Sequence, residues 1–553
     1  MKKNINKIAV LALIGAFTVS CADLDTAPQG GTMTSEQKKD VVSLIPGRLN
    51  ADVLGMFSAS GIQWYVYGSG SNRVDDYSYP AVCLMRDLEG SDMSCFGGDY
   101  DWFSTSAEYS NRTYTYANPR IQWDTFFKQI KLANDVLLSI DTDTQDETLL
   151  TYRGQALALR AFDYFNLAQR YAYTYVGHED DPCIPIVTDI TSSDPSVDKS
   201  NLPRETNRKV YEQIMNDINE AVTLLKDKPA RADKTTIDYQ VALGIRAKVK
   251  LVMGDYAGAA KDAAEARAGY TLLSITDVSK PGFNDLAISS WMWGIKILPD
   301  NITDAYECWP GQLSSFADGY TIAVGCYKDI NILLYSKIPA TDVRKGWWVD
   351  EDRKSPLIDG LTWNGSGDIG NLKIQDVKEP FNAYTNVKFS AYQDELGGST
   401  GAGDWVIMRA EEMLLIEAEG LAMSSQEAAA KTLLEGWVKT YRDPSYTCKA
   451  TSAAGLRNEI WMQRRVELWG EGHAVLDLLR LEKPMVRFNS RIASTNVPDA
   501  AKFNIAADAP MRLMVIPQRE ISSNNGISED QNNQTGNIPK PGDGATLTDG
   551  VTD

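Results

Sequence analysis

The stretch GLRNEIWMQRRVELWGEGHAVLDLLR, residues 455–480, is the most distinctive segment of this 553-residue chain. Within it, Arg464, Glu467 and Glu471 follow one another at intervals of three and four residues, which places them on one face of an α-helix. Opposite charges on one helical face predict ion pairs that hold this helix against its neighbours. The segment therefore indicates a fold built from packed helices.

Apolar residues recur with helical periodicity in several other parts of the chain. The turn Met253-Gly254-Asp255-Tyr256, followed by closely spaced alanines, resembles the turn of a tetratricopeptide repeat, in which small residues let paired helices approach closely. We expect a mainly α fold, a right-handed superhelix of tetratricopeptide-like helix pairs with minor β hairpins. The pairs are predicted within residues 35–57, 119–140, 152–172, 206–268, 406–441 and 455–482.

Two long insertions, residues 58–118 and 281–405, interrupt the helical pattern and are rich in Gly, Ser, Asp, Tyr and Trp. Loops of this length inside a compact protein usually carry function, so we expect both insertions to face a ligand. Trp293, in an apolar run, is instead predicted to lie in a core strand. Residues 533–553 are predicted to form a polar C-terminal tail.

The N-terminus predicts export and a lipid anchor. Lys2, Lys3 and Lys7 precede an apolar run from Ile8 to Val19 that is too short to span a bilayer, and Cys21 follows. This arrangement resembles a bacterial lipoprotein signal peptide, residues 1–20, in which Cys21 becomes the lipidated first residue. An ordinary secretory signal with an incidental cysteine is the alternative. No later stretch is long and apolar enough for a transmembrane helix, so a lipid tether is expected.

Composition excludes several classes of function. The chain has 55 Lys and Arg against 74 Asp and Glu, a net charge of −19, which disfavours nucleic-acid binding. It has two histidines, His178 and His473, and no HExxH motif, which argues against histidine-rich zinc sites. Hydrolysis by a carboxylate pair and plain binding remain.

The segment 455–480 is similar to the C-terminal pattern of the SusD/RagB family of Bacteroidota outer-membrane lipoproteins. The chain departs from this pattern at Gln463 and Ala474. The matching residues are Ile460, Arg464, Glu467, Leu468, Glu471, Gly472, Asp477, Leu478 and Arg480.

The resemblance implies a single domain, residues 21–532, with four tetratricopeptide-like pairs and a loop-rich part. It also implies a surface-exposed outer-membrane lipoprotein that binds oligosaccharides, or sometimes peptides, without cleaving them. The implied partner is a SusC-like TonB-dependent transporter that contacts the helical face. The matching pattern itself contains no ligand-binding residue.

Aromatic residues in the insertions are the binding candidates. A Trp or Tyr ring can cover the apolar face of a sugar while charged and amide groups bind its hydroxyls. For each aromatic, packing of the loop on the helices is the alternative. We predict that Trp102 with Asp92, Trp309 with Tyr320, and also Tyr79 and Arg73, contact the ligand.

Three other hypotheses remain. Glu467 and Glu471 have the spacing for a glycosidase carboxylate pair, although nearby arginines favour a structural role. A peptide-binding member of the family and a helical scaffold without a small ligand are further alternatives. No cofactor is expected, and the sequence does not settle whether a loop holds a structural calcium ion.

The sequence also leaves the state of the cysteines open. Cys83 with Cys95 is the closest pair after Cys21, and both a disulfide and free buried thiols are consistent with the spacing. The remaining cysteines are Cys183, Cys308, Cys326 and Cys448.

Overall fold

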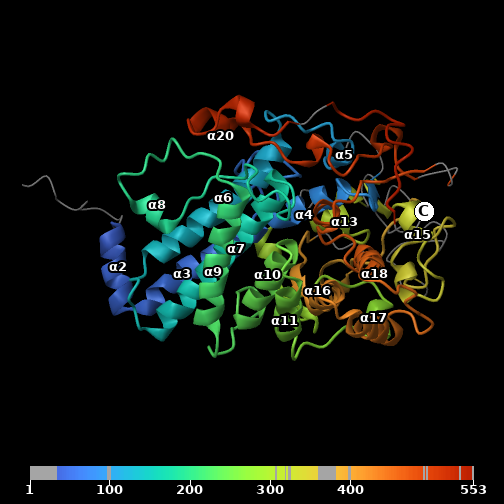
Figure 1. Cartoon of the computed structure of the whole chain (residues 1–553), viewed down its shortest axis with the longest axis horizontal. Coiled ribbons are helices and arrows are strands. Elements are labelled where there is room, and N and C mark those ends of the chain that lie inside the picture. Colours follow the sequence, from blue (N-terminus) through green and yellow to red (C-terminus); the bar gives the residue numbers. More distant parts are fainter. Residues whose placement is uncertain are drawn as a thin grey trace, which may run out of the picture.

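The computed structural model is mainly helical (Figure 1). It describes residues 34–95, 101–304, 308–317, 319–321, 325–358, 381–395, 400–489, 492, 496–534 and 537–550. The predicted signal peptide and Cys21 lie outside this part of the chain.

The helices of the predicted pairs form a row across the molecule, with the N-terminal helices at one end and the C-terminal helices of the row at the other (Figure 1). Consecutive members of the row contact one another, and one large apolar core runs through helices and insertions alike. These helices agree with the predicted ranges to within a few residues, and the predicted helical, tetratricopeptide-like class is confirmed. Their bounds are α2 Ser35–Leu44, α3 Asn50–Ser58, α6 Ala117–Leu138, α7 Glu147–Tyr171, α9 Asn207–Leu225, α10 Tyr239–Val252, α11 Tyr256–Ala266, α16 Ala410–Met423, α17 Glu427–Tyr441 and α18 Ala453–Glu467.

The α10–α11 turn shows how the sequence sets this packing. Gly254 has a φ of +80°, a conformation that favours glycine, and the Asp255 side chain accepts a hydrogen bond from the Gly258 N–H to cap α11. Gly420 on α16 faces α11 so closely that a Cβ there would lie 2.5 Å from the Tyr256 carbonyl oxygen. Small residues at the turn and at this contact therefore let α10, α11 and α16 pack side by side.

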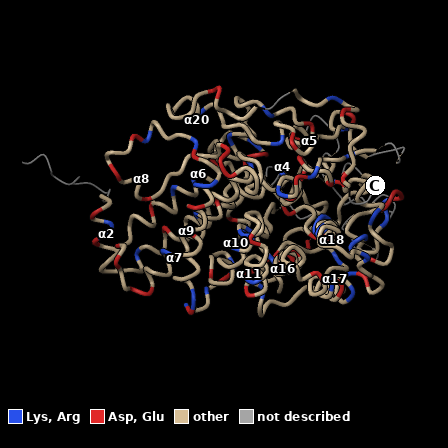
Figure 2. The backbone as a smooth tube through the Cα atoms, viewed as in Figure 1, with Lys and Arg blue, Asp and Glu red and all other residues tan. Residues whose placement is uncertain are grey.

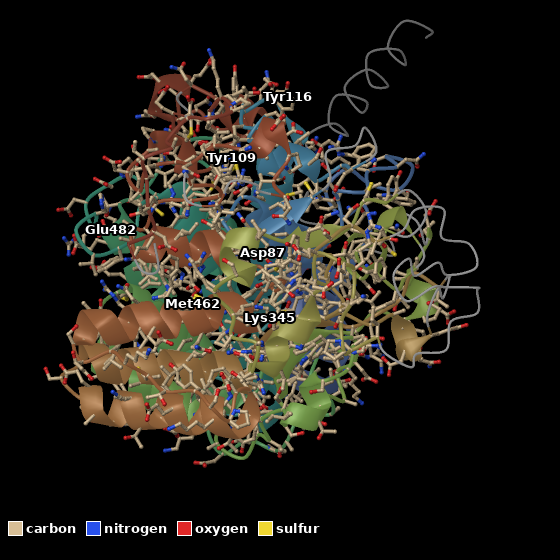
Figure 3. All side chains as sticks on the ribbon, turned by 90° about the vertical axis from the view of Figure 1, so that its right-hand side faces the viewer. Asp87, Tyr109, Tyr116, Lys345, Met462 and Glu482 are labelled. Carbon is tan, nitrogen blue, oxygen red and sulfur yellow. The ribbon has the colours of Figure 1, made fainter. Side chains whose placement is uncertain are left out.

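The other helices lie between the members of this row, in the insertions and after α18. Asp87, in the second half of α4, accepts hydrogen bonds from the Gly472 and Ala474 N–H groups at the start of α19. Burial raises the pKa of Asp87 to about 7, and Figure 3 shows this residue in the middle of the molecule. The short helices are α4 Ser78–Leu88, α5 Ser104–Ala107, α8 Asp189–Ser193, α12 Ile275–Val278, α13 Pro310–Leu313, α15 Ile332–Tyr335, α19 Ala474–Arg480 and α20 Gln518–Ser523.

Within the described residues, four strands form two small antiparallel sheets. Strand β1 (Met93–Cys95) pairs with β3 (Lys328–Ile330), and β2 (Trp291–Ile295) pairs with β4 (Trp405–Arg409). Trp293 lies in β2 and is 1% exposed, which confirms the predicted core strand. The pairs are not the hairpins we expected, because each joins strands that are far apart in the sequence. Strand β4 also occupies the start of the 406–441 segment that was predicted to be helical.

Buried ion pairs join α18 to the second insertion and to β4, and basic residues gather at α18 in Figure 2. Glu467 contacts Arg409 at 2.8 Å, Arg442 at 2.7 Å and Arg344 at 3.2 Å. Glu471 contacts Arg409 at 2.8 Å and Lys388 at 2.7 Å. The predicted ion pairs of Arg464, Glu467 and Glu471 are therefore present, mostly with residues outside α18. The prediction that all three share one helical face was wrong for Glu471, because α18 ends at Glu467 and Glu471 lies in the turn before α19.

The C-terminal arm, predicted as a polar tail over residues 533–553, makes specific contacts in its described residues. The Asn504 N–H donates to the Asp543 carbonyl oxygen at 2.9 Å, and Asp549 contacts Arg465 at 3.0 Å. The arm therefore packs on the body of the protein through specific polar contacts.

Cys83 and Cys95 are buried free thiols, so the pair closest in sequence forms no disulfide. Burial raises the pKa of the Cys83 thiol to about 12, which keeps it protonated. Cys183, Cys326 and Cys448 are also buried free thiols, and Cys308 is buried.

Candidate ligand-binding site

The first insertion presents a stack of aromatic and arginine side chains at the surface, which we call the Trp102 stack: Trp102, Arg73, Tyr67 and Arg120. The Arg73 guanidinium carbon lies 5.3 Å from the Trp102 ring centroid and 5.2 Å from that of Tyr67. The Arg120 guanidinium carbon, from α6, lies 4.2 Å from the same Tyr67 ring. Trp102 is 37% exposed, so its indole reaches water while one neighbour is an arginine.

Local structure holds the two segments of the stack in place. The Asp76 carboxylate accepts hydrogen bonds from the backbone N–H groups of Val66 and Tyr67, which closes the turn that carries Tyr67. On the other segment, buried Asp101 accepts a hydrogen bond from the Phe103 N–H at 3.0 Å and from Lys328 Nζ at 2.9 Å. Trp102 thus projects from between two buried residues, which limits the motion of its backbone.

Polar groups next to the stack have unused hydrogen-bonding capacity. Arg73 Nη2 donates to Asp75 Oδ2 at 2.7 Å, but Arg73 Nε and Asp75 Oδ1 have no hydrogen-bond partner. Burial raises the pKa of Asp75, and the neighbouring Arg73 opposes this shift. Both of these atoms are buried, so a ligand hydroxyl can meet only the exposed part of the Arg73 side chain, which is 27% exposed beside the Trp102 indole.

The structure brings together two of the predicted site residues, Trp102 and Arg73. Tyr67 and Asp75 belong to the same aromatic and acidic insertion. Arg120 was not predicted, because it lies in the first turn of α6, a helix whose apolar stripe indicated only packing. The exposed Tyr116, just before α6, lies outside the stack. Figure 3 shows Tyr116 in the upper part of the molecule near its edge.

The other four predicted residues lie elsewhere. Asp92 is buried and forms a two-pronged ion pair with Arg465 at 2.6 and 2.9 Å. Tyr79 is buried against Phe126 and Phe162. These two side chains offer no surface to a ligand, because each is enclosed by partners distant in sequence.

The predicted pair of Trp309 and Tyr320 is not an exposed platform. Trp309 is 4% exposed, donates its indole N–H to the Gly403 carbonyl oxygen at 3.0 Å and packs edge-on against Trp405. Tyr320 is half-buried and packs against the main core. Trp363, another tryptophan of the second insertion, lies outside the described residues.

Glu467 and Glu471 do not have the environment of a glycosidase pair. Both are fully buried among cations, and three arginines hold the pKa of Glu467 well below its usual range. A general acid needs the opposite shift and access to the substrate. In the part of the chain that the structure covers, no three His, Cys, Asp or Glu side chains are grouped to hold a metal ion.

Comparison with known proteins gives the family. A family profile described as "Starch-binding associating with outer membrane" matches residues 84–251, and the profile of the SusD family matches residues 361–534. The chain belongs to the SusD/RagB family. No functionally curated protein matches it.

Solved structures share the fold over almost their whole length. A SusD-like carbohydrate-binding protein from Bacteroides vulgatus is 22% identical, with a TM-score of 0.70 over 88% of this chain and 98% of that one. SusD superfamily proteins from Bacteroides thetaiotaomicron and Bacteroides fragilis are 20% and 19% identical, with TM-scores of 0.65 and 0.64. Both alignments cover 88% of this chain and 99% of the other.

SusD family proteins are carbohydrate-binding proteins associated with the outer membrane. Among the described helices, none combines the length and the apolar character needed to cross a membrane.

Proposed function

We propose that this protein is a cell-surface lipoprotein, anchored through Cys21, that captures an oligosaccharide at the Trp102 stack and passes it to a SusC-like TonB-dependent transporter. The observation that carries the proposal is the exposed indole of Trp102, held beside Arg73 and Tyr67 on a fixed backbone. Family membership supports binding of a carbohydrate. The stack supports where on this chain the sugar binds.

Recognition follows from the two chemical faces of a sugar. The apolar C–H face of a pyranose ring covers the indole of Trp102, and hydroxyl groups at the ring edge accept hydrogen bonds from Arg73. None of these groups is placed for covalent chemistry, so the ligand leaves unchanged. A small aromatic platform gives modest affinity, which suits transfer to a second protein. The tether keeps the released ligand close to the transporter.

Binding to the site is tested by titrating the mature chain with purified oligosaccharides and with peptides of similar size in a calorimeter. We expect an oligosaccharide to bind and Trp102→Ala to weaken that binding by about 10- to 100-fold, the loss typical of a stacking anchor. Tyr116→Ala is the matched control, because Tyr116 is another exposed aromatic, at 52%, outside the stack. Peptide binding without oligosaccharide binding would favour the peptide-binding alternative. If Trp102→Ala and Tyr116→Ala lost the same amount of oligosaccharide affinity, the Trp102 stack would not be the binding site.

Transfer is tested separately, by co-expressing the chain with a SusC-like TonB-dependent transporter from the same genome and purifying either partner. We expect a complex that forms equally well with Trp102→Ala, because the stack binds the ligand and not the transporter. Failure to form any complex with that transporter would contradict the delivery step while leaving the binding proposal intact.

A further inference from the structure

Five buried arginines surround a single carboxylate in the part of the molecule between α4, α7 and the segments around residues 112 and 512. We call this group the Glu89 cluster. Glu89 follows the end of α4 and is fully buried, and each of the five arginines is only 1% exposed. The arginines are Arg86, Arg112, Arg170, Arg487 and Arg512.

Two of the arginines contact one oxygen of Glu89, and a third lies beside them through its backbone. Arg112 Nη2 lies 3.1 Å from Glu89 Oε2, and Arg170 Nη2 donates a short hydrogen bond to the same oxygen. Arg170 Nη1 also reaches the Arg512 carbonyl oxygen at 3.4 Å, which places the Arg512 backbone beside Arg170. The second oxygen, Glu89 Oε1, accepts a hydrogen bond from Gln122 at 3.3 Å.

Arg86 and Arg487 complete the cluster from two other segments. Arg86 lies three residues before Glu89, and its Nη1 donates at 2.7 Å to Asn166, one helical turn before Arg170 on α7. Arg487 donates to the carbonyl oxygens of residues on either side of Glu89, at 2.6 Å to Leu88 and 2.9 Å to Gly90.

Several guanidinium nitrogens of the cluster have no hydrogen-bond partner although they are buried. They are Nε and Nη2 of Arg86, Nε of Arg112, Nε of Arg170 and Nη2 of Arg512. Buried donors are nearly always satisfied, and an unsatisfied charged donor is especially unfavourable. An acceptor that belongs to no protein residue is therefore expected among them.

The excess of positive charge in the Glu89 cluster also indicates a bound acceptor that is negatively charged. The buried ion pairs around Glu467 and Glu471 are balanced in charge, with four cations and four carboxylates. The cations are Arg344, Lys388, Arg409 and Arg442, and the carboxylates are Asp342, Glu411, Glu467 and Glu471. In the Glu89 cluster, Glu89 is the one acid that ion pairs join to the arginines among the described residues. Several uncompensated cations in a low-dielectric interior repel one another, and water supplies an acceptor but no compensating charge.

We propose that a small monovalent inorganic anion, chloride under ordinary conditions, binds in the Glu89 cluster and is held by the unpartnered nitrogens of Arg86, Arg112, Arg170 and Arg512. The site is structural. It joins α4 and α7 to the segment that continues from Trp102 through Tyr109, whose ring lies 4.2 Å from the Arg112 guanidinium carbon. The anion thereby stabilises the interior support of the insertion that carries the Trp102 stack.

The direct test uses crystals of the mature wild-type chain grown in sodium bromide, with diffraction data collected at the bromine edge. Bromide replaces chloride and gives an anomalous signal that water does not give. We expect a peak within hydrogen-bonding distance of Arg86 and Arg170. Bromide peaks only at exposed surface residues, with water-like density in the cluster, would overturn the proposal in favour of buried water.

Thermal unfolding gives a second test. At constant ionic strength, replacing gluconate by chloride from 1 to 100 mM should raise the Tm by about 3 °C and then saturate, as a ligand bound to the folded state does. Arg86→Gln should abolish this chloride dependence. Arg480→Gln, which removes a buried arginine paired with Glu419 and Asp477 outside the cluster, should keep it. The same chloride response in both variants would contradict the assignment.

Discussion

The two aromatic insertions differ in how far their aromatic side chains are exposed to solvent. In the first insertion, residues 58–118, Trp102 is 37% exposed and Tyr65 and Tyr67 are only partly buried, although other rings of this segment are in the core. In the second insertion, residues 281–405, five tryptophans are each at most 1% exposed: Trp291, Trp293, Trp347, Trp348 and Trp405.

The neighbours of the rings differ as well. In the first insertion Trp102 and the partly buried Tyr67 lie against Arg73, Tyr67 also lies against Arg120, and Tyr65 lies against Lys128. In the second insertion the rings meet other aromatics, such as Trp309 with Trp405 and Trp347 with Trp348, and β2 pairs with β4. Aromatic content alone therefore does not indicate a binding surface. Contact with a cation does not either, because Lys388 Nζ lies 4.7 Å from the buried Trp347 ring. The exposure of the Trp102 ring is what distinguishes the first insertion.

The largest expected effect comes from truncating a ring of the second insertion. Trp293→Ala removes a ring that packs 4.9 Å from Phe162 and donates to the Thr235 carbonyl oxygen. We expect a loss of about 3–5 kcal/mol in unfolding free energy, measured by chemical denaturation. Trp102→Ala, the same change at the exposed ring, should cost less than about 1 kcal/mol. Equal losses would show that Trp102 is a core residue.

The next effect concerns the buried ion pairs that anchor the second insertion. Glu467→Gln leaves Arg344, Arg409 and Arg442 without their shared carboxylate, and we expect a loss of about 3 kcal/mol at pH 7. Because the pKa of Glu467 is lowered in the folded state, its stabilisation is complete above the ordinary Glu pKa of about 4.5 and is lost as pH falls through the folded value. Chemical denaturation of the wild type and of Glu467→Gln from pH 7 to pH 3 measures the difference between their unfolding free energies, which should become smaller as the pH falls.

Asp75 in the first insertion should show the opposite slope. Burial raises its pKa in the folded state, so the wild type loses stability relative to Asp75→Asn as pH rises from about 4 through the folded pKa. If the unfolding free energy relative to the wild type changed with pH in the same direction for Glu467→Gln and Asp75→Asn, the predicted opposite pH dependences would be wrong.

Local pattern predicts part of this contrast and long-range contacts decide the rest. Helical periodicity located α6, α7 and α9 to within a few residues, and the apolar run around Trp293 indicated a core strand. Asp92 and Trp309 looked as suitable for a ligand as Trp102 did. Their partners, Arg465 and the β4 residue Trp405, are far away in the sequence, so the spacing of the insertion residues carried no signal of burial.

The smallest expected effect separates the shape of the Trp102 ring from its presence. Trp102→Phe keeps an aromatic face over Arg73 but reduces the area that covers a sugar. We expect about 3- to 5-fold weaker oligosaccharide binding by calorimetry, less than the loss for Trp102→Ala, and an unchanged unfolding free energy. If Phe bound as poorly as Ala, the indole N–H and not the ring face would be the contact. If Phe and Ala both bound like the wild type, Trp102 would be outside the site, and the exposed ring of the first insertion would be no closer to the ligand than the buried rings of the second.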